Sequence, residues 1–197
     1  GQLGGGDDGL VAFEDGKVVN RVQIEICKDY YKSIPNYGRG AAQIGCWLFF
    51  ISTGGDQVWC FDMRRIVKKE KDEKGGVYDV LPGEFSLIQD IVSSGDTIYI
   101  LNRKGQCWVY RSNSCKELPL FVNTYELKPK SQIANKSFDY YSISHCNNHI
   151  FVAGYCPASQ EAALILSNHL SGHTFDSVIY TTPSLSKLLL NQNTHSE

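Results

Sequence analysis

The feature that most constrains the fold of this chain is a unit of strands and turns that recurs about every 50 residues. When Leu48 is matched with Ile98 and Ile150, the spacings are 50 and 52 residues, and Trp59 and Trp108 then coincide, 49 residues apart. Period and residue type agree, which indicates an internal repeat. The three copies span 41–62, 87–111 and 139–168.

Each copy predicts the same succession of β-strands. A first strand ends in a tight polar turn, such as Ser94-Gly95-Asp96, where hairpin turns demand the positive φ that Gly, Asn and Asp tolerate. A nearly all-apolar strand follows, written WLFFI, TIYIL and HIFVA, and such continuous apolarity is typical of strands buried on both faces. A second turn then leads to a third strand, QVWCF, QCWVY or AALIL.

A fourth element closes each copy, and it ends in an apolar residue followed by proline. The endings are Leu81-Pro82, Leu118-Pro119 and a weaker Thr182-Pro183. Proline cannot donate to a β-ladder, so it marks an edge strand or the exit from one. Upstream, GLVAFEDGKVVNRVQIEI predicts two strands around an Asp15-Gly16 turn, as in a partial copy.

These units predict an all-β chain, namely a β-propeller or a propeller segment built from four-stranded antiparallel blades. We predict a flexible lead-in at 1–9, propeller-like repeats at 10–183 and a tail at 184–197. The repeats divide into a partial blade at 10–36 and blades at 38–83, 85–120 and 137–183. The units could form part of a larger ring, or a compact four-bladed ring in which strands from both ends complete one blade. The segment SLSKLLLNQ in the tail could be a helix or one more strand.

Several of these features resemble the kelch-repeat family. They are the turn before an IYIL-like strand, the Gly54-Gly55 pair after that strand, third strands that close with CFD or VYR, and an aromatic-to-Leu-Pro ending. The resemblance covers most of the chain from Leu10 to Pro183, and it implies a propeller whose inter-strand loops contact a protein partner. The chain departs from the kelch pattern at the second and third glycine pairs, where it has Asn102-Arg103 and Gly154-Tyr155. It also departs at the fourth-strand tryptophan, in whose place the successive units have Tyr31, Val77, Cys115 or Lys116, and Phe175.

Charge and hydropathy argue against two classes of partner. The formal net charge of −2 and a pI near 6.2 give no general attraction to nucleic acid or to acidic membranes. The longest apolar run is CWLFFI, far short of the roughly 18–20 residues that span a bilayer, so no membrane insertion is expected.

The seven cysteines form no Cys-x-x-Cys pair, and their odd number argues against a complete internal disulfide framework. This pattern predicts reduced, mostly buried thiols in a cytoplasmic protein. A single Asn135-Lys136-Ser137 sequon leaves secretion as the less favoured alternative.

The nearest approach to a metal site is the group His145, Cys146 and His149, with a second His-x3-His spacing at His169 and His173. Because the first pair spans a predicted hairpin turn, its two imidazoles do not share a helix face, and we predict no metal site. No Gly-x-Ser-x-Gly elbow and no phosphate loop is present. The sequence therefore predicts no catalytic residue and no cofactor.

Two roles are possible for the side chains of Trp59 and Trp108. They could form a stacking platform for a ligand or pack in the core between blades. Their equivalent positions in the repeat favour the core. Function is then expected in the loops between strands, together with the charged segment RRIVKKEKDEKGG, which is otherwise a solvated loop.

The predicted function is a non-enzymatic protein-interaction or scaffold module, part of a larger polypeptide or complex. The alternative is a propeller-fold enzyme, or a ligand- or sugar-binding domain, with its site at the mouth of the channel. The predicted partner-binding residues are Asn102, Arg103, Lys104, Tyr155, Gln160 and Glu161.

Overall fold

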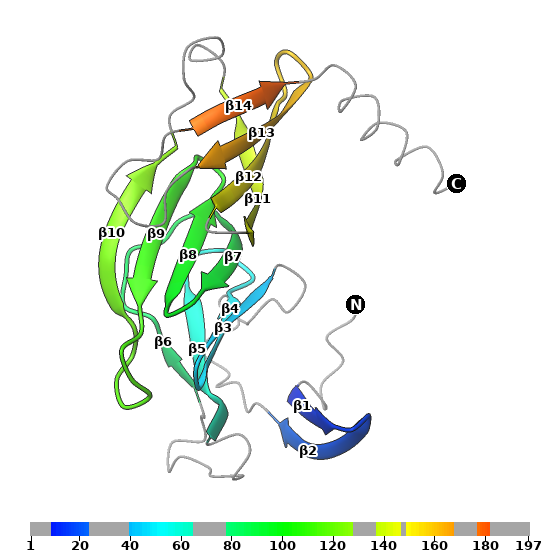
Figure 1. Ribbon diagram of the computed structural model, residues 1–197, viewed down its shortest axis with the longest axis vertical. Helices are drawn as coiled ribbons and strands as arrows, with labels where there is room; N and C mark the ends of the chain where they lie inside the picture. The colour runs from blue at the N-terminus through cyan, green and yellow to red at the C-terminus, as the bar shows by residue number, and fades with distance from the viewer. Residues whose placement is uncertain are drawn as a thin grey trace.

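The computed structural model describes residues 9–23, 40–64, 78–127, 137–146, 149–167 and 177–181. These residues form a two-stranded sheet and three four-stranded sheets, all antiparallel (Figure 1). The two-stranded sheet contains β1 (Gly9–Glu14) and β2 (Lys17–Gln23). In the described part of the chain, no helix has the length and apolar character that a membrane crossing requires.

Each four-stranded sheet is a meander of consecutive strands, and we refer to each as a blade. The first blade contains β3 (Ala41–Ile44), β4 (Trp47–Ile51), β5 (Val58–Asp62) and β6 (Tyr78–Val80). The second contains β7 (Ile88–Ser94), β8 (Thr97–Asn102), β9 (Gln106–Arg111) and β10 (Leu120–Glu126). The third contains β11 (Asp139–Cys146), β12 (His149–Cys156), β13 (Glu161–Ser167) and β14 (Ser177–Thr181).

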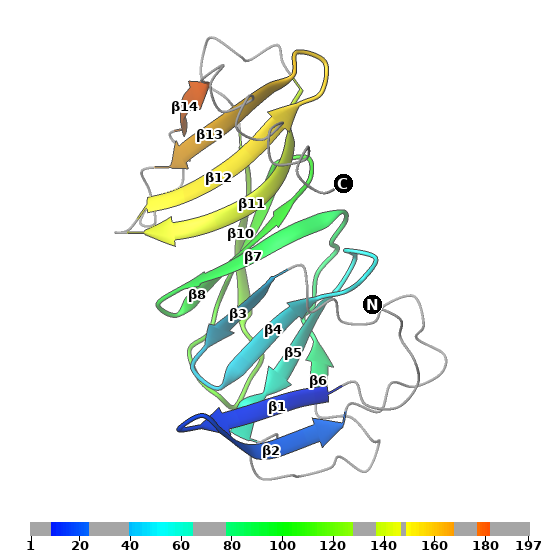
Figure 2. The same cartoon turned by 90° about the vertical axis from the view of Figure 1, so that its right-hand side faces the viewer.

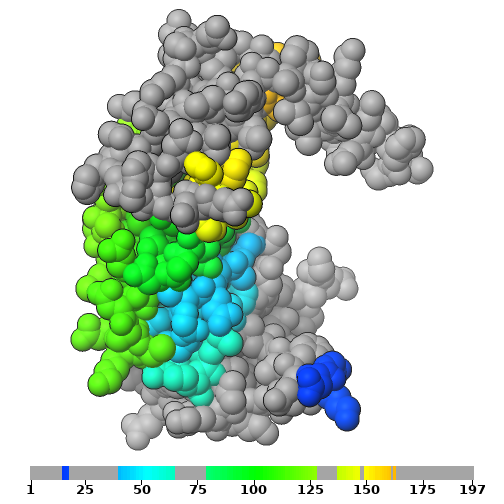
Figure 3. All heavy atoms as spheres, in the orientation of Figure 1, coloured from blue at the N-terminus to red at the C-terminus, as the bar shows by residue number. Residues whose placement is uncertain are grey.

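The blades follow one another along the long axis of the molecule in chain order, as Figure 2 shows. Their first strands are neighbours, since β7 lies beside both β3 and β11. In the space-filling view the middle blade fills the space between the other two (Figure 3). Successive four-stranded meanders that pack face to face, with their first strands adjacent, form a β-propeller arrangement. The predicted fold class is confirmed.

Two apolar cores separate the three blades. The core between the first and second blades consists mainly of Ala42, Ile44, Trp47, Phe49, Ile51, Val58, Cys60, Leu81, Phe85, Ile88, Ile91, Ile98, Ile100, Trp108 and Tyr110. The core between the second and third blades consists mainly of Tyr99, Leu101, Cys107, Val109, Leu127, Phe138, Tyr140, Ile143, Ile150, Val152 and Cys156. Trp108 lies in the first core, so its prediction as a residue of the core between blades is confirmed. Trp59 is 1% exposed and therefore buried, but it lies outside both of these cores, on the other side of the first blade.

The β4–β5 and β8–β9 turns are built alike. Ser52 and Asn102, at equivalent positions of the repeat, are both fully buried, and each accepts two backbone N–H groups of its own turn with a side-chain oxygen. Gly55 and Gly105 follow at φ of 70° and 86°, and their N–H groups donate to the carbonyls of Ser52 and Asn102. The repeat thus extends to the hydrogen bonds of these turns.

We expect Gly105→Ala to destabilise the protein by more than about 1 kcal/mol, because alanine at positive φ is strained. In addition, the new Cβ would lie 2.6 Å from Cε2 of Tyr140, a side chain of the second core. Gly95→Ala is the matched control, since Gly95 has φ 58° and open space around its would-be Cβ. Urea unfolding of both variants measures the difference, and equal losses of stability would contradict the contribution of the Tyr140 contact.

The fourth strand of the second blade lies elsewhere than predicted. The sequence placed it in SCKELPL, ahead of Pro119, whereas the strand that pairs with β9 is β10, which begins at Leu120. Here proline precedes the edge strand instead of ending it. In the first blade the prediction is confirmed, since β6 leads directly into Leu81-Pro82.

Among the described strands, no blade is completed by strands from both ends of the chain. The third blade takes all four of its strands from residues 139–181, and β1 and β2 pair only with each other. The described strands therefore do not close the compact ring that was one of the two predicted alternatives. Lead-in residues 1–8, the charged segment from residue 65, the Asn135 sequon, His169, His173 and the tail lie outside the described residues.

The expectation that all thiols are reduced is wrong for two of them, because Cys46 and Cys115 form a disulfide. This bond joins the β3–β4 turn of the first blade to the β9–β10 loop of the second. Of the other described cysteines, none forms a disulfide; Cys60, Cys107 and Cys156 are buried, and Cys146 is exposed. Burial raises the pKa of the Cys107 thiol to about 12 and also raises the pKa of Cys60, so both remain protonated and unreactive at neutral pH.

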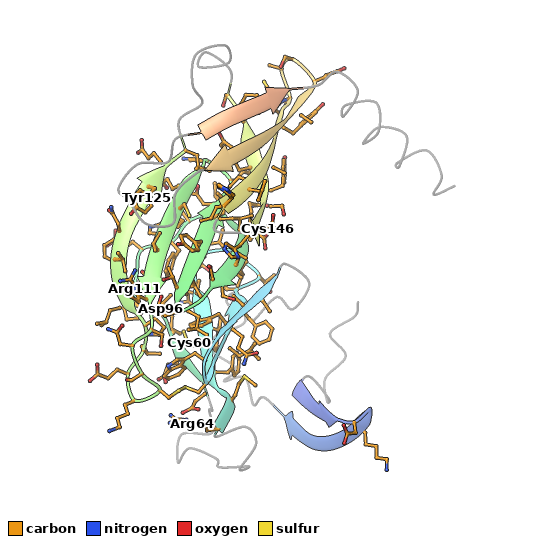
Figure 4. All side chains as sticks on the ribbon, viewed as in Figure 1. Cys60, Arg64, Asp96, Arg111, Tyr125 and Cys146 are labelled. Atoms are coloured by element: carbon orange, nitrogen blue, oxygen red, sulfur yellow. A yellow bond between two sulfur atoms is a disulfide. The ribbon has the colours of Figure 1, made fainter. Side chains whose placement is uncertain are left out.

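Polar contacts surround the disulfide. The indole Nε1 of Trp47 donates to the carbonyl of Ser114 at 3.3 Å, beside the bond. The Arg64 guanidinium donates to the carbonyl of Cys115 and forms an ion pair with Asp62 at 2.7 Å (Figure 4). These contacts fix the β9–β10 loop against the first blade.

Candidate interaction surface

The predicted partner-binding residues fall in two turns at equivalent places of consecutive blades. Arg103 and Lys104 are exposed in the β8–β9 turn, and Gln160 is exposed at the end of the β12–β13 turn. Tyr155 is half-buried near the end of β12, and the backbone of Glu161 pairs with Cys156 at the start of β13.

The side chain of Asn102 is not exposed to a partner. It is fully buried, its Oδ1 accepts the N–H groups of Lys104 and Gln106, and its Nδ2 donates to the Gln106 side chain at 2.8 Å. A buried amide that meets its hydrogen bonds inside one turn stabilises that turn. Asn102 therefore positions Arg103 and Lys104, and its side chain does not belong to the exposed surface of this turn.

Arg103 makes the central polar contact of this region, and it does so with the next blade. Its guanidinium donates to Oδ2 of Asp139 on β11 at 2.7 Å, and its Cζ lies 6.0 Å from the ring centroid of Tyr141. The hydrogen bond from Arg103 lowers the pKa of Asp139, and the same bond raises the pKa of Arg103. Asp139 is paired with Tyr155 in the β11–β12 ladder. Asp139 thus connects the two predicted turns, because its side chain accepts from Arg103 and its strand position pairs with Tyr155.

Two exposed apolar residues beside Arg103 were missed from the sequence. Leu87 is 46% exposed at φ 52°, and its carbonyl accepts the N–H of Arg103 at 3.0 Å. Tyr141 is 46% exposed, and it is the extra residue of a β-bulge, since Tyr140 pairs with Gly154 and Ser142 with Ala153. Neither a positive φ nor a bulge interrupts the apolar pattern of the sequence, so only the structure reveals them.

We define the Arg103 surface as Leu87, Arg103, Lys104, Asp139 and Tyr141. Its backbone is fixed on both sides of the guanidinium, because the Arg103 N–H donates to Leu87 and the Arg103 carbonyl accepts from Tyr140 at 3.0 Å. Exposed arginine and tyrosine on a rigid backbone are the residues that most often dominate the binding energy of protein interfaces, and rigidity lowers the entropy that binding costs.

A half-buried carboxylate, Asp90, lies on β7, the first strand of the middle blade. Its Oδ1 accepts the N–H of Ile91 and its Oδ2 accepts the N–H of Ile143 on β11, both at 2.9 Å. Burial raises the pKa of Asp90 against the effect of these hydrogen bonds. Because one carboxylate oxygen bonds its own strand and the other bonds β11, Asp90 links the second blade to the third.

His145, from the predicted cluster of histidine and cysteine, contacts the neighbouring blade. Its Nε2 lies 3.1 Å from Oγ of Ser94. Within the described ranges, no three His, Cys, Asp or Glu side chains come close enough together to hold a metal ion.

No protein-family model matches the chain, and no curated protein matches it. Among solved structures, an assembly of Dbp5 with Nup159, Gle1, IP6 and ADP from S. cerevisiae matches with a TM-score of 0.47 and 8% identity, over 72% of this chain and 36% of that one. The N-terminal domain of Nup159 matches with a TM-score of 0.49 and 8% identity over the same shares. A protein from Lactobacillus plantarum matches with a TM-score of 0.37 and 9% identity, over 73% of this chain and 54% of that one. This chain thus spans about a third of the length of the first two matches, and likenesses of this size assign no family to it.

Proposed function

We propose that the chain is a non-enzymatic protein-interaction module, a kelch-like propeller segment that binds a protein partner through its inter-strand loops. The observation that carries the proposal is the Arg103 surface, which presents an exposed arginine and tyrosine beside an exposed leucine. The kelch resemblance of the repeats supports the same kind of role. On this proposal the blades serve as a rigid scaffold and the loops supply recognition.

The ion pair between Arg103 and Asp139 contributes little to folding, because both side chains are accessible to water, at 48% and 27% of their surface. It does hold the guanidinium in one orientation over Tyr141. A partner that stacks on these two groups would therefore bind to a surface already in its bound shape.

The test replaces both exposed side chains in the full-length chain. We expect Arg103→Ala combined with Tyr141→Ala to reduce recovery of the partner by roughly tenfold or more, as for the truncation of interface hot spots. Recovery is measured by affinity purification from source cells with quantitative mass spectrometry, and thermal unfolding checks that the fold is retained.

Arg111→Ala is the matched control. Arg111 is also an exposed arginine next to a carboxylate, with its Nε 3.6 Å from Oδ1 of Asp96, but it lies at the opposite end of the strands of the same blade (Figure 4). The control should retain its partners. Equal recovery with the double variant and with the control would contradict the proposal.

A further inference from the structure

Both contacts between blades use the same positions of the repeat. Phe49 and Ile51 of β4 lie in the core between the first and second blades, and Tyr99 and Leu101 of β8 lie in the core between the second and third. All four are at most 5% exposed. We call this side of a blade, which is turned towards the next blade in the chain, its distal face.

In the third blade, none of the described residues forms a comparable core over the distal face. Since Ile150 matches Ile98, the residues equivalent to Tyr99 and Leu101 are Phe151, which is half-buried, and Ala153, which is exposed. Tyr155 continues the same side of β12 and is half-buried. On the neighbouring β11, Ser144 and Ser142 are paired with Phe151 and Ala153 and are both exposed. We call Ser142, Ser144, Phe151, Ala153 and Tyr155 the distal surface.

We propose that the distal surface is the docking site for a further β-sheet, supplied by a partner polypeptide, that packs on the third blade as the second blade packs on the first. A sheet is the occupant that the molecule itself places on this kind of face, at both covered copies of it. The five residues of the distal surface carry no charge, so the occupant must present an apolar or neutral face.

The backbone indicates where the docking sheet would begin. At each existing contact, the turn between the second and third strands supplies a carbonyl to the start of the next blade. Gly55 accepts from Ile88 at 2.8 Å, and Arg103 accepts from Tyr140 at 3.0 Å. The equivalent turn of the third blade is 157–160, and all four of its residues are exposed. The first strand of the docking sheet would therefore start beside this turn, next to Tyr155.

A second copy of this chain fits the distal surface less well than a partner does. To continue the series, a second copy would have to offer the opposite side of its first blade, which carries Phe50, Trp59 and Phe61. These three side chains are already 6%, 1% and 0% exposed, so that side is covered.

Site-specific photo-cross-linking in source cells tests the proposal. p-Benzoylphenylalanine replaces Phe151 in the full chain and, as a matched control, Phe121, an aromatic side chain that is 57% exposed on β10. The expected result is an adduct at position 151 and not at 121, in which the cross-linked peptide is an alternately apolar strand of another polypeptide. Introducing Tyr155→Lys or, separately, Ala153→Lys should reduce the adduct by roughly tenfold or more.

Each other outcome overturns the proposal. An adduct with peptides of this chain would assign the surface to a second copy or to a segment of the chain outside the described residues, and equal adducts at both positions would indicate non-specific contact. Absence of an adduct at position 151 would show that no sheet docks there. The Arg103→Ala variant separates this proposal from the proposed function, because it should leave the adduct at position 151 unchanged. Thermal unfolding of both lysine variants shows whether a lost adduct reflects docking or folding.

Discussion

Replacing Trp108 with alanine is expected to lower the free energy of unfolding by about 3–5 kcal/mol, as is typical when a buried tryptophan is truncated to alanine. Trp108 is 8% exposed in the core between the first and second blades. Its ring meets Phe85 edge to face, with centroids 5.3 Å apart. The loss combines the transfer free energy of the indole with the free-energy cost of the cavity that it leaves between the two sheets, because a close-packed core fills such a cavity only in part.

Phe121→Ala is the reference for this prediction. It removes an aromatic ring from the same blade, but one that is 57% exposed, with its centroid 5.6 Å from that of the core residue Tyr110. Chemical unfolding followed by circular dichroism should show a loss for Phe121→Ala well below half of that for Trp108→Ala. If Trp108→Ala kept wild-type stability, the tryptophan would be a ligand platform instead of a core residue.

The strands that the sequence predicts most directly are those that bury both faces. β8 is buried at every position and β5 likewise, so their apolar runs are continuous and unambiguous. β10 could not be read in this way, because Leu120, Phe121 and Val122 at its start are all exposed. An edge strand with little burial leaves no alternation in the sequence, and the nearby proline was then misassigned to its end.

The sequence predicted only the part of the Arg103 surface that lies within a single turn. The β8–β9 turn is encoded by Asn, Lys and Gly within a few residues, so Arg103 and Lys104 could be identified as loop residues. The partner of Arg103 is Asp139, 36 residues away in another blade, and a contact of that kind depends on how the blades stack. The Cys46–Cys115 pair, 69 residues apart, likewise could not be deduced from cysteine spacing.

Removing the disulfide with Cys46→Ser and Cys115→Ser is expected to lower the free energy of unfolding by about 2–4 kcal/mol. The bond closes a loop across 69 residues that spans two blades, and cross-linking so long a loop restricts the unfolded chain more than the folded one. Cys146→Ser is the matched control, because Cys146 is exposed and free and should change stability little. Guanidinium unfolding of the three proteins gives the comparison.

Thiol titration under denaturing conditions provides an independent check, since two more thiols should react after reduction with dithiothreitol than before it. An unchanged count would contradict the disulfide. The fold should persist without the bond, because the contacts of Trp47 with Ser114 and of Arg64 with Cys115 do not depend on it.

The outcome also bears on the compartment in which the protein is most stable. Glutathione and thioredoxin keep cytosolic thiols reduced, so a protein that needs this bond for stability would reach its full stability only in an oxidising compartment.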